Sequence, residues 1–486
     1  MENQLFVTNS LTREKELFKP INAPYVGMYV CGPTVSGESH LGHSRPYVTF
    51  DVIYRYLTHL GHKVRYVRNI TDAGHFEEEG REATDKVNEK AKLERLEPME
   101  LVQKYTNLFH DMMDLLNCER PAIEPTATGH IVEQIDMIQE IIRKGFAYEK
   151  NGSVYFDVTK YAKGGDYGKL SGRVIEDMIA GSRDLDGQDE KNHPADFALW
   201  KNAPPEHIMR WNSPWGSGFP GWHIECSAMA TKYLGSPFDI HGGGMDLMFP
   251  HHESEIAQSH VACGCMPVKY WLHNNMITIN GRKMGKSYNN TITLREMFFG
   301  GHHLLERPYP PMTVRFFILQ TQYRSTLDFS NDALQAAEKA LSRLLNAYDA
   351  IGKIAPSATN SSDLNTIADA CKDAMNDDFN TAIVIAQLFE LTRIVNSAVT
   401  GTETLTADGI AQAKNIFETY LFGILGIKRE EKSNSGDVDG LMKLIIDIRA
   451  QAKTNKDFAT SDKIRDELGK LGISIKDGKD GTTWTN

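Results

Sequence analysis

The hydrophobic positions near the start of the chain alternate between a strand pattern and a helix pattern. An apolar run at 26–30 leads into a glycine-containing turn, and an amphipathic pattern then extends from about Pro46 to Leu60. Gly61 ends that pattern, and a second strand-like run covers 64–71. Strand, turn, helix and strand in this order predict a βαβ unit, whose ligand crevice lies at the carboxyl ends of its parallel strands.

The later pattern predicts that this α/β domain is interrupted and then followed by helices. The stretch 121–220 is less regular and contains a polar loop at 181–192, and the chain becomes rich in motifs again from Trp222. After Pro310-Pro311 the pattern is helical, with linker-like polar stretches at 356–362 and 431–440. We therefore expect a Rossmann-like parallel-sheet α/β domain, split by an insertion and followed by helical C-terminal domains.

Composition narrows the class of protein. A chain of 486 residues is too long for one core and should form two to four domains. Six cysteines give no disulfide framework, no apolar run approaches a membrane span, and the start has no signal-peptide pattern, so we expect a cytoplasmic protein without membrane contact. The net charge of −11 argues against non-specific nucleic-acid binding by the whole surface, although 441–486 is mildly basic.

The turn after the first strand carries candidate chemistry. It begins with a thiol at Cys31 and a glycine at Gly32, and it ends in His40-Leu-Gly-His43 just before the predicted helix. Helix-start N–H groups are unpaired and the dipole is positive there, which is why α/β proteins hold nucleotide phosphates at such turns. The two histidines could donate hydrogen bonds to these phosphates.

A second cluster is dense in metal-ligand residue types. His251 and Glu255 are spaced i,i+4 and share one helix face, while Cys226 lies upstream and Cys31 comes from the other half of the sheet. Two Cys, one His and one Glu suit zinc. Taken singly, each of these residues is more often a core or surface residue. Cys263-Gly-Cys265 is a competing pair, but it lacks a second pair, and we interpret it, like Cys118 and Cys371, as structural or exposed.

A third candidate is the lysine loop, which we define as 283–287. An apolar strand beginning at Met276 runs into a turn at Asn280-Gly281, and Lys283 and Lys286 follow. Two lysines on a glycine-bearing loop can follow a polyphosphate and neutralise its charge. Without further context, an exposed basic loop explains the same pattern.

Two of these segments resemble the signature motifs of class I aminoacyl-tRNA synthetases. His40-Leu-Gly-His43 is similar to the HIGH motif, and Lys283-Met-Gly-Lys-Ser287 is similar to KMSKS, with Gly285 for a serine. Further segments resemble blocks of the cysteinyl branch of the family. The chain departs from the family pattern at Ser36-Gly-Glu38, at Gly285 and in the run 73–80. The similar blocks are 31–35, 66–72, 221–226, 241–255, 375–381 and 456–465.

The resemblance implies a role for each candidate residue. One zinc ion per chain is implied on Cys31, Cys226, His251 and Glu255. Catalytic roles at ATP, which enters with Mg²⁺, are implied for His40, His43, Lys283 and Lys286, and Gly32 and Gly42 join them as ATP-binding residues. An amino-acid pocket is implied around Thr71, Trp222, His241 and Asp246.

The resemblance also implies an activity and an organisation. It implies a monomeric AMP-forming ligase that activates L-cysteine with ATP and esterifies the 3′ end of tRNA(Cys). The implied parts are two catalytic halves (1–120 and 221–300) around a connective insertion (121–220), a helical stem-contact region (301–355), a helical tRNA-binding bundle (364–430) and an anticodon-side domain (441–486).

Two other functions share much of this pattern. A cysteine-activating ligase that transfers the adenylate to a small amine, such as an amino sugar, could carry every active-site motif. An inactive zinc-dependent RNA-binding paralogue is the second alternative, but the intact His40, His43, Lys283 and Lys286 argue against it.

Overall fold

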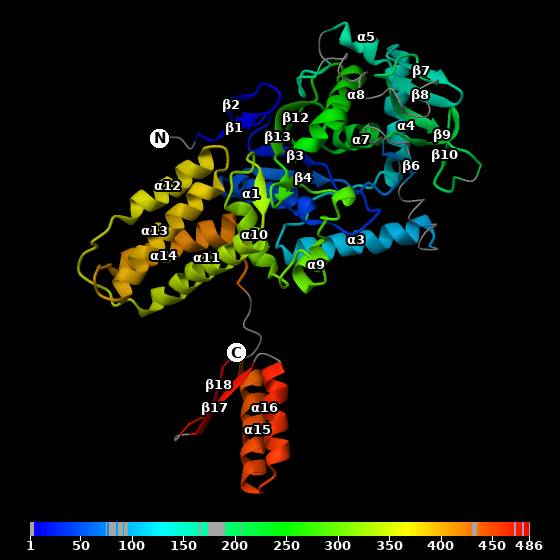
Figure 1. Cartoon of the computed structure of the whole chain (residues 1–486). Helices are drawn as coiled ribbons and strands as arrows, with labels where there is room; N and C mark the ends of the chain where they lie inside the picture. The colour runs from blue at the N-terminus through cyan, green and yellow to red at the C-terminus, as the bar shows by residue number, and fades with distance from the viewer. Residues whose placement is uncertain are drawn as a thin grey trace. The chain divides into compact units, whose positions relative to one another are not determined.

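The computed structural model describes most of the chain and divides it into two units. The described residues are 4–73, 75, 76, 84, 85, 91, 96–164, 167–173, 190–205, 207–429, 435–470, 473–478 and 481–485. The units are Met1–Ile427 and Lys428–Asn486 (Figure 1). Most of the polar loop expected at 181–192, and parts of the run 73–80 and of the linker at 431–440, lie outside the described residues.

A four-stranded parallel sheet forms the centre of the first unit, in the order β13-β12-β3-β4. Its strands are β3 (Tyr25–Val30), β4 (Lys63–Arg68), β12 (Phe238–Gly244) and β13 (Val268–Asn274), and helix α1 (Leu41–His59) connects β3 to β4. Tyr29 on β3 lies opposite Val67 on one side and His241 on the other. This sheet confirms the predicted parallel α/β domain.

Helix α1 begins earlier than the sequence pattern predicts. It starts at Leu41 with His40 at its N-cap, and Pro46 lies inside it. The prediction of a start near Pro46 is wrong because tertiary contacts fix the first turn: the fully buried Leu41 donates its main-chain N–H to the carbonyl oxygen of Ile292 at 2.9 Å. The helix therefore accommodates the proline without the intrahelical bond that its missing N–H would make.

The insertion between the sheet halves forms its own antiparallel sheet, in the order β10-β11-β9-β8-β7. Its apolar side packs on helices α7 and α8, which return the chain to the parallel sheet. The elements are α4 (Ile131–Arg143), β7 (Ala147–Lys150), β8 (Ser153–Phe156), α5 (Val158–Ala162), β9 (Phe197–Asn202), β10 (Trp211–Ser213), β11 (Gly216–Pro220), α7 (Trp222–Leu234) and α8 (Glu253–Cys263).

A small third sheet carries the lysine loop. Strand β14 (Ile277–Ile279) pairs antiparallel with β15 (Arg282–Lys283) and parallel with β16 (Leu327–Phe329). The turn between β14 and β15 uses positive φ at Asn280 (49°) and Gly281 (76°), a backbone conformation that asparagine and glycine tolerate best. A short 3₁₀ turn, Lys286–Tyr288, and helix α9 (Leu294–Phe299) follow.

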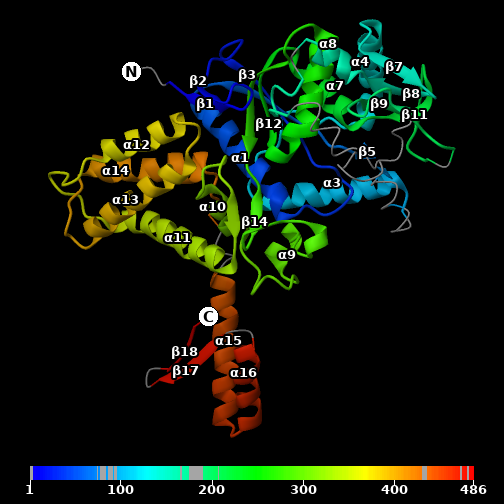
Figure 2. The same ribbon diagram turned by 45° about the horizontal axis from the view of Figure 1, so that its top comes forward.

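Helices complete both units. In the two views, α11–α14 gather on one side of the parallel sheet and the insertion lies on the other (Figure 2). The remaining elements of the first unit are β1 (Phe6–Asn9), β2 (Glu14–Leu17), β5 (His75–Phe76), β6 (Thr84–Asp85), α3 (Pro98–Leu115), α10 (Pro311–Leu319), α11 (Asn331–Ala350), α12 (Leu364–Asn376), α13 (Thr381–Val399) and α14 (Ala407–Ile416), which continues as a π-helix at Phe417–Ile424. The second unit contains α15 (Ser435–Thr454), α16 (Phe458–Lys470), β17 (Ser474–Gly478) and β18 (Gly481–Thr485).

Among the described residues, α13 alone is long and apolar enough to cross a membrane. It packs against α11 and α12, and it buries Leu388, Leu391 and Val395 completely. One such helix is weak evidence for a membrane protein, because a core helix has the same composition.

A buried ion pair ties α1 to α10. Arg315 donates to the Asp51 carboxylate, and both side chains are almost inaccessible to solvent. Asp51→Ala should lower the free energy of unfolding by about 3–5 kcal/mol, because it leaves the Arg315 cation buried without its partner. Urea denaturation checks this. Asp114→Ala, which removes an exposed pair with Arg120, should cost less than about 1 kcal/mol; equal losses would contradict the interpretation.

Candidate metal and nucleotide site

The four predicted metal ligands come together at the carboxyl end of the parallel sheet. Cys31 directly follows β3, and its main-chain N–H donates to Gly242 on β12 at 3.2 Å. Cys226 lies on α7, and Glu255 lies on α8 one helical turn after His251. The fold therefore unites donors that are far apart in the sequence.

The distances within this group suit one shared ion. The Cys31 Sγ lies 3.9 Å from the Cys226 Sγ and 3.8 Å from Glu255 Oε1, and the His251 Nε2 lies 3.0 Å from the same carboxylate oxygen. The ligand atoms of all four residues lie within 4.8 Å of one another, and all four side chains are buried. We call these four residues the Cys₂HisGlu cluster.

The electrostatics favour the charged form of Cys226 and Glu255, whereas burial and these two neighbours raise the pKa of Cys31 well above its usual value. Burial alone would raise the pKa of Cys226, but the hydrogen bond from Cys31 and the charge of His251 outweigh it and lower this pKa to about 6. Burial likewise opposes ionisation of Glu255, yet His241 and His251 lower its pKa to about 2. A thiolate and a carboxylate in a buried site call for a cation.

A second donor set, which the sequence analysis missed, shares two of these residues. The ligand atoms of Cys31 and Glu255 also lie within 4.8 Å of those of His241 and His252. The His252 Nε2 is 3.3 Å from the Cys31 Sγ, and its Nδ1 is 2.7 Å from the His273 Nε2. The i,i+4 spacing to Glu255 favoured His251 over its neighbour His252. The pair of adjacent histidines before Glu253 was the sequence feature that could have indicated His252 as a second candidate ligand.

Three of the four predicted pocket residues contact the cluster or a residue next to one of its members. The Trp222 ring lies 4.4 Å from that of His251, and the His241 Nε2 lies 2.9 Å from Glu255 Oε2. Thr71 hydrogen-bonds to the buried Glu225 carboxylate at 3.1 Å. The exception is Asp246, which is exposed just beyond β12.

Asn69 is a further residue that the sequence analysis missed. Its side chain accepts the main-chain N–H of Gly32 at 2.8 Å and donates to Thr71 at 3.0 Å. A Cβ at Gly32 would lie 1.5 Å from the Asn69 carbonyl oxygen, so only glycine fits this contact. Asn69 thus fixes the turn after β3 against the segment after β4 that carries Thr71. The position of Asn69 near the end of the predicted strand 64–71 was the only sequence feature that pointed to this residue.

The two histidines of the predicted nucleotide turn stack on each other. The rings of His40 and His43 are 3.7 Å apart and nearly parallel, and the His40 N–H donates to the His43 Nδ1 at 3.2 Å. His43 keeps part of its surface exposed, yet burial of its ring and the charge of His40 lower its pKa to about 3. The imidazole is therefore neutral at physiological pH.

The lysine loop lies beside this histidine pair. The Met284 Cε is 3.3 Å from where a Cβ on Gly42 would be, and the Leu294 N–H donates to the Ser39 carbonyl at 2.8 Å. Asn290 closes the loop by accepting from the Gly285 N–H and donating to the Lys283 carbonyl. Lys283 is exposed, and Lys286 begins the short 3₁₀ turn.

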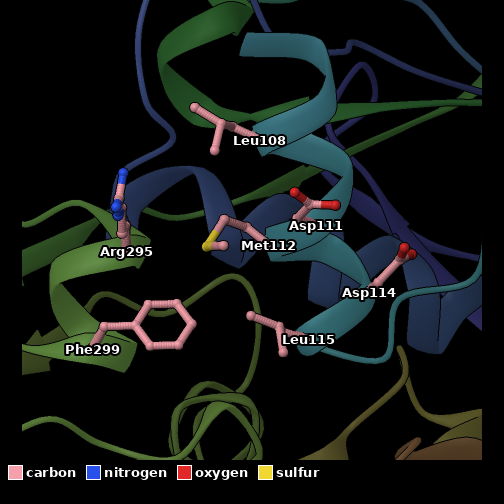
Figure 3. Close-up of a pocket in the computed structure, with 7 residues that line it drawn as sticks. All are labelled: Leu108, Asp111, Met112, Asp114, Leu115, Arg295 and Phe299. Atoms are coloured by element: carbon pink, nitrogen blue, oxygen red, sulfur yellow. The ribbon is translucent and has the colours of Figure 1, made fainter. Parts of the chain in front are cut away.

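A surface pocket lies elsewhere, between α3 and α9 (Figure 3). Leu108, Met112 and Leu115 of α3 face Arg295 and Phe299 of α9, with Asp111 and Asp114 beside them. Its lining includes none of the predicted site residues.

Comparison with known proteins identifies the family. The model of the class I (C) tRNA synthetase catalytic domain matches residues 17–339, that of the DALR domain matches 370–429, and that of the cysteinyl-tRNA ligase anticodon-binding domain matches 444–484.

Full-length relatives agree with these models. The chain is 59% identical to the cysteine–tRNA ligase of Bacteroides fragilis, over 100% of this chain and 99% of that protein. It is 55% identical to that of Cytophaga hutchinsonii, over 99% and 98%. The methionyl-tRNA synthetase of Mycobacterium tuberculosis shares the fold, with a TM-score of 0.54 and 13% identity over 82% of this chain and 89% of that one. The chain therefore belongs to the cysteine–tRNA ligase family of class I tRNA synthetases.

Proposed function

We propose that the chain is a cysteine–tRNA ligase, which activates L-cysteine with ATP to cysteinyl adenylate and pyrophosphate and then esterifies the 3′ end of tRNA(Cys). The observation that carries this proposal is the buried Cys₂HisGlu cluster beside the His40–His43 turn at one end of the parallel sheet. Full-length likeness to cysteine–tRNA ligases supports the same activity.

The residues present fit a zinc ion. Two thiols, an imidazole and a carboxylate, buried within 4.8 Å of one another, form a typical zinc donor set. When bound there, zinc supplies selectivity for a thiol, since thiolate is a far better zinc ligand than an alcohol. An apolar pocket alone would separate cysteine from serine poorly.

The pocket residues orient the rest of the amino acid. The His241 Nδ1 is buried and has no hydrogen-bond partner among the described residues, which leaves it for the substrate. The Trp222 ring lies against the ring of His251. The Asn69 side chain hydrogen-bonds to both Gly32 and Thr71, and so holds Thr71 next to the turn after β3. Asp246 is exposed just beyond β12, and its role at the amino acid rests on the family resemblance alone.

The histidine pair acts on the phosphates. The cysteine carboxylate attacks the α-phosphorus of ATP in line, so positioning and charge stabilisation dominate the chemistry. Because the His43 Nδ1 accepts the His40 N–H, the neutral ring carries its proton on Nε2, which can donate to a phosphate oxygen. Gly32 and Gly42 let the main chain approach the nucleotide, and Lys283 and Lys286 neutralise the departing pyrophosphate with Mg²⁺.

The C-terminal parts would hold the tRNA. The DALR match and the anticodon-binding match cover the helical bundle and the second unit. A ligase that acts on a small amine would need neither of these two domains. Unstacked anticodon bases are the readable element of such an RNA. We further propose that the chain acts as a monomer in the cytoplasm.

One experiment separates the candidate functions. Cysteine-dependent ATP–pyrophosphate exchange should be measured first, followed by charging of tRNA(Cys) transcript. We expect both activities. Absence of exchange would refute enzymatic function and leave the RNA-binding alternative, whereas exchange without charging would favour transfer to a small amine.

A further inference from the structure

Arg45 is a buried cation without an acidic partner. It lies on α1 two residues after His43, and its side chain is almost completely buried. Among the described residues no carboxylate forms an ion pair with it. Burial lowers its pKa only to about 10, so the guanidinium stays charged. A buried charge is costly unless it is well bonded, so its partners indicate what it does.

Those partners are main-chain carbonyls of two other segments. The Arg45 Nη1 donates to the Met276 carbonyl at 2.7 Å. The Nη2 donates to the carbonyls of Tyr323, at 3.3 Å, and of Ser325, with a longer contact to that of Gln322. The planar guanidinium thus joins the helix of the histidine pair to both of these segments at once.

The first segment is Met276 and the start of β14, which we call the root of the lysine loop. Met276 directly precedes β14, which leads through the turn at Asn280 to Lys283. The Met276 carbonyl also accepts the Leu327 N–H at 3.2 Å, at the start of the paired strand β16. Arg45 therefore contacts the small sheet where both of its parallel strands begin.

The second segment, 322–325, is itself held in place by hydrogen bonds to Asp378. The buried Asp378 carboxylate accepts the Tyr323 hydroxyl at 2.8 Å, and its main-chain carbonyl accepts the Gln322 side chain at 2.8 Å. Asp378 lies in the 375–381 block and also accepts the Thr8 N–H at 2.8 Å. Asn275 donates to the Arg324 carbonyl at 3.0 Å. The guanidinium thus bonds to a fixed support.

We propose that Arg45 is a positioning residue for adenylate formation: by bonding the carbonyls of Met276 and 322–325, it fixes the root of the lysine loop relative to His40 and His43. The inference rests on the proposed function. The two sides of the ATP site belong to separate elements, α1 and the small sheet, and Arg45 is a direct polar link between them. A displacement of about 1 Å between catalytic groups can cost a hundredfold in rate.

Arg45→Lys tests the proposal, because lysine keeps the charge but cannot span the two segments with a planar fork. We expect kcat for cysteine-dependent ATP–pyrophosphate exchange to fall about 10- to 100-fold, with KM for cysteine changed less than about threefold because the cysteine pocket does not involve Arg45. Asn275→Ala, which loosens the same root from the surface side, should lower kcat by a smaller factor in a folded protein.

Arg315→Lys is the matched control. Arg315 is also fully buried and also bonds main-chain carbonyls, those of Leu116 and Leu425, but among the described residues none of its hydrogen-bond partners belongs to the small sheet. It should lower the melting temperature and leave kcat within about twofold. An unchanged kcat in Arg45→Lys and Asn275→Ala, or an equal kcat loss in Arg315→Lys, would overturn the proposal. Absence of exchange in the unaltered chain would instead refute the proposed function.

Discussion

Cys226→Ser should abolish stoichiometric zinc binding and lower kcat/KM for cysteine in ATP–pyrophosphate exchange by about a thousandfold. The expected loss exceeds the 10- to 100-fold typical of an outer-shell residue, because Cys226 is itself a ligand. Its lowered pKa of about 6 means that the native side chain offers a thiolate at neutral pH, which a serine hydroxyl cannot replace. Metal analysis of the purified variant and exchange kinetics with cysteine and serine measure both effects.

The control for this substitution is Cys371→Ser. Cys371 is also a fully buried thiol, but it lies on α12 in the helical bundle, and burial raises its pKa to about 12. It should retain one zinc ion and full exchange activity, even if the variant is less stable. If Cys226→Ser kept its zinc and its preference for cysteine over serine, the ligand assignment would be wrong.

His43→Ala should lower kcat for exchange by about 10²–10³-fold with little change in KM for ATP. The substitution removes a donor that we place at the phosphate, and loss of one such donor costs about this factor. Because the effect belongs to the transition state, kcat and kcat/KM should fall together. Steady-state kinetics against His59→Ala, an exposed histidine near the other end of the same helix, provide the comparison.

The pH dependence follows from the pKa of His43. Burial and the charge of His40 lower this pKa to about 3, so the ring is neutral from pH 5 to 9 and would gain a proton only in strong acid. We therefore expect no change in log kcat near pH 6.5 that depends on His43. A loss of kcat as the pH rises through 6.5, absent in His43→Asn but present in His59→Ala, would show that the imidazolium is the active form.

The residue types of the site could be predicted from the sequence better than their contacts. The Cys₂HisGlu donors follow from ligand chemistry and from the i,i+4 spacing of His251 and Glu255, because a helix places such residues on one face. The parallel sheet followed from the strand, turn and helix pattern and is confirmed. The sequence did not show which histidine partners Cys31, since His251 and His252 each belong to a donor set that contains this thiol and only the three-dimensional structure brings both sets together.

Residues that act through main-chain contacts gave little sequence signal. Asn69 and Arg45 both bond backbone groups of segments that the fold brings together from far along the chain, such as Met276. The start of α1 at Leu41 was missed for the same reason, because a hydrogen bond to Ile292 sets it. The local sequence pattern shows periodicity and residue type. The contacts of Asn69 and Arg45 and the start of α1 depend instead on which distant segments the fold brings together.

The central claim is that the Cys₂HisGlu cluster binds the metal on which cysteine activation depends. Titration of the metal-free chain with zinc, followed by cysteine-dependent ATP–pyrophosphate exchange, tests this most directly. We expect negligible exchange without metal and a linear rise that saturates at one zinc ion per chain. Full exchange by a chain shown to be free of metal would contradict the account.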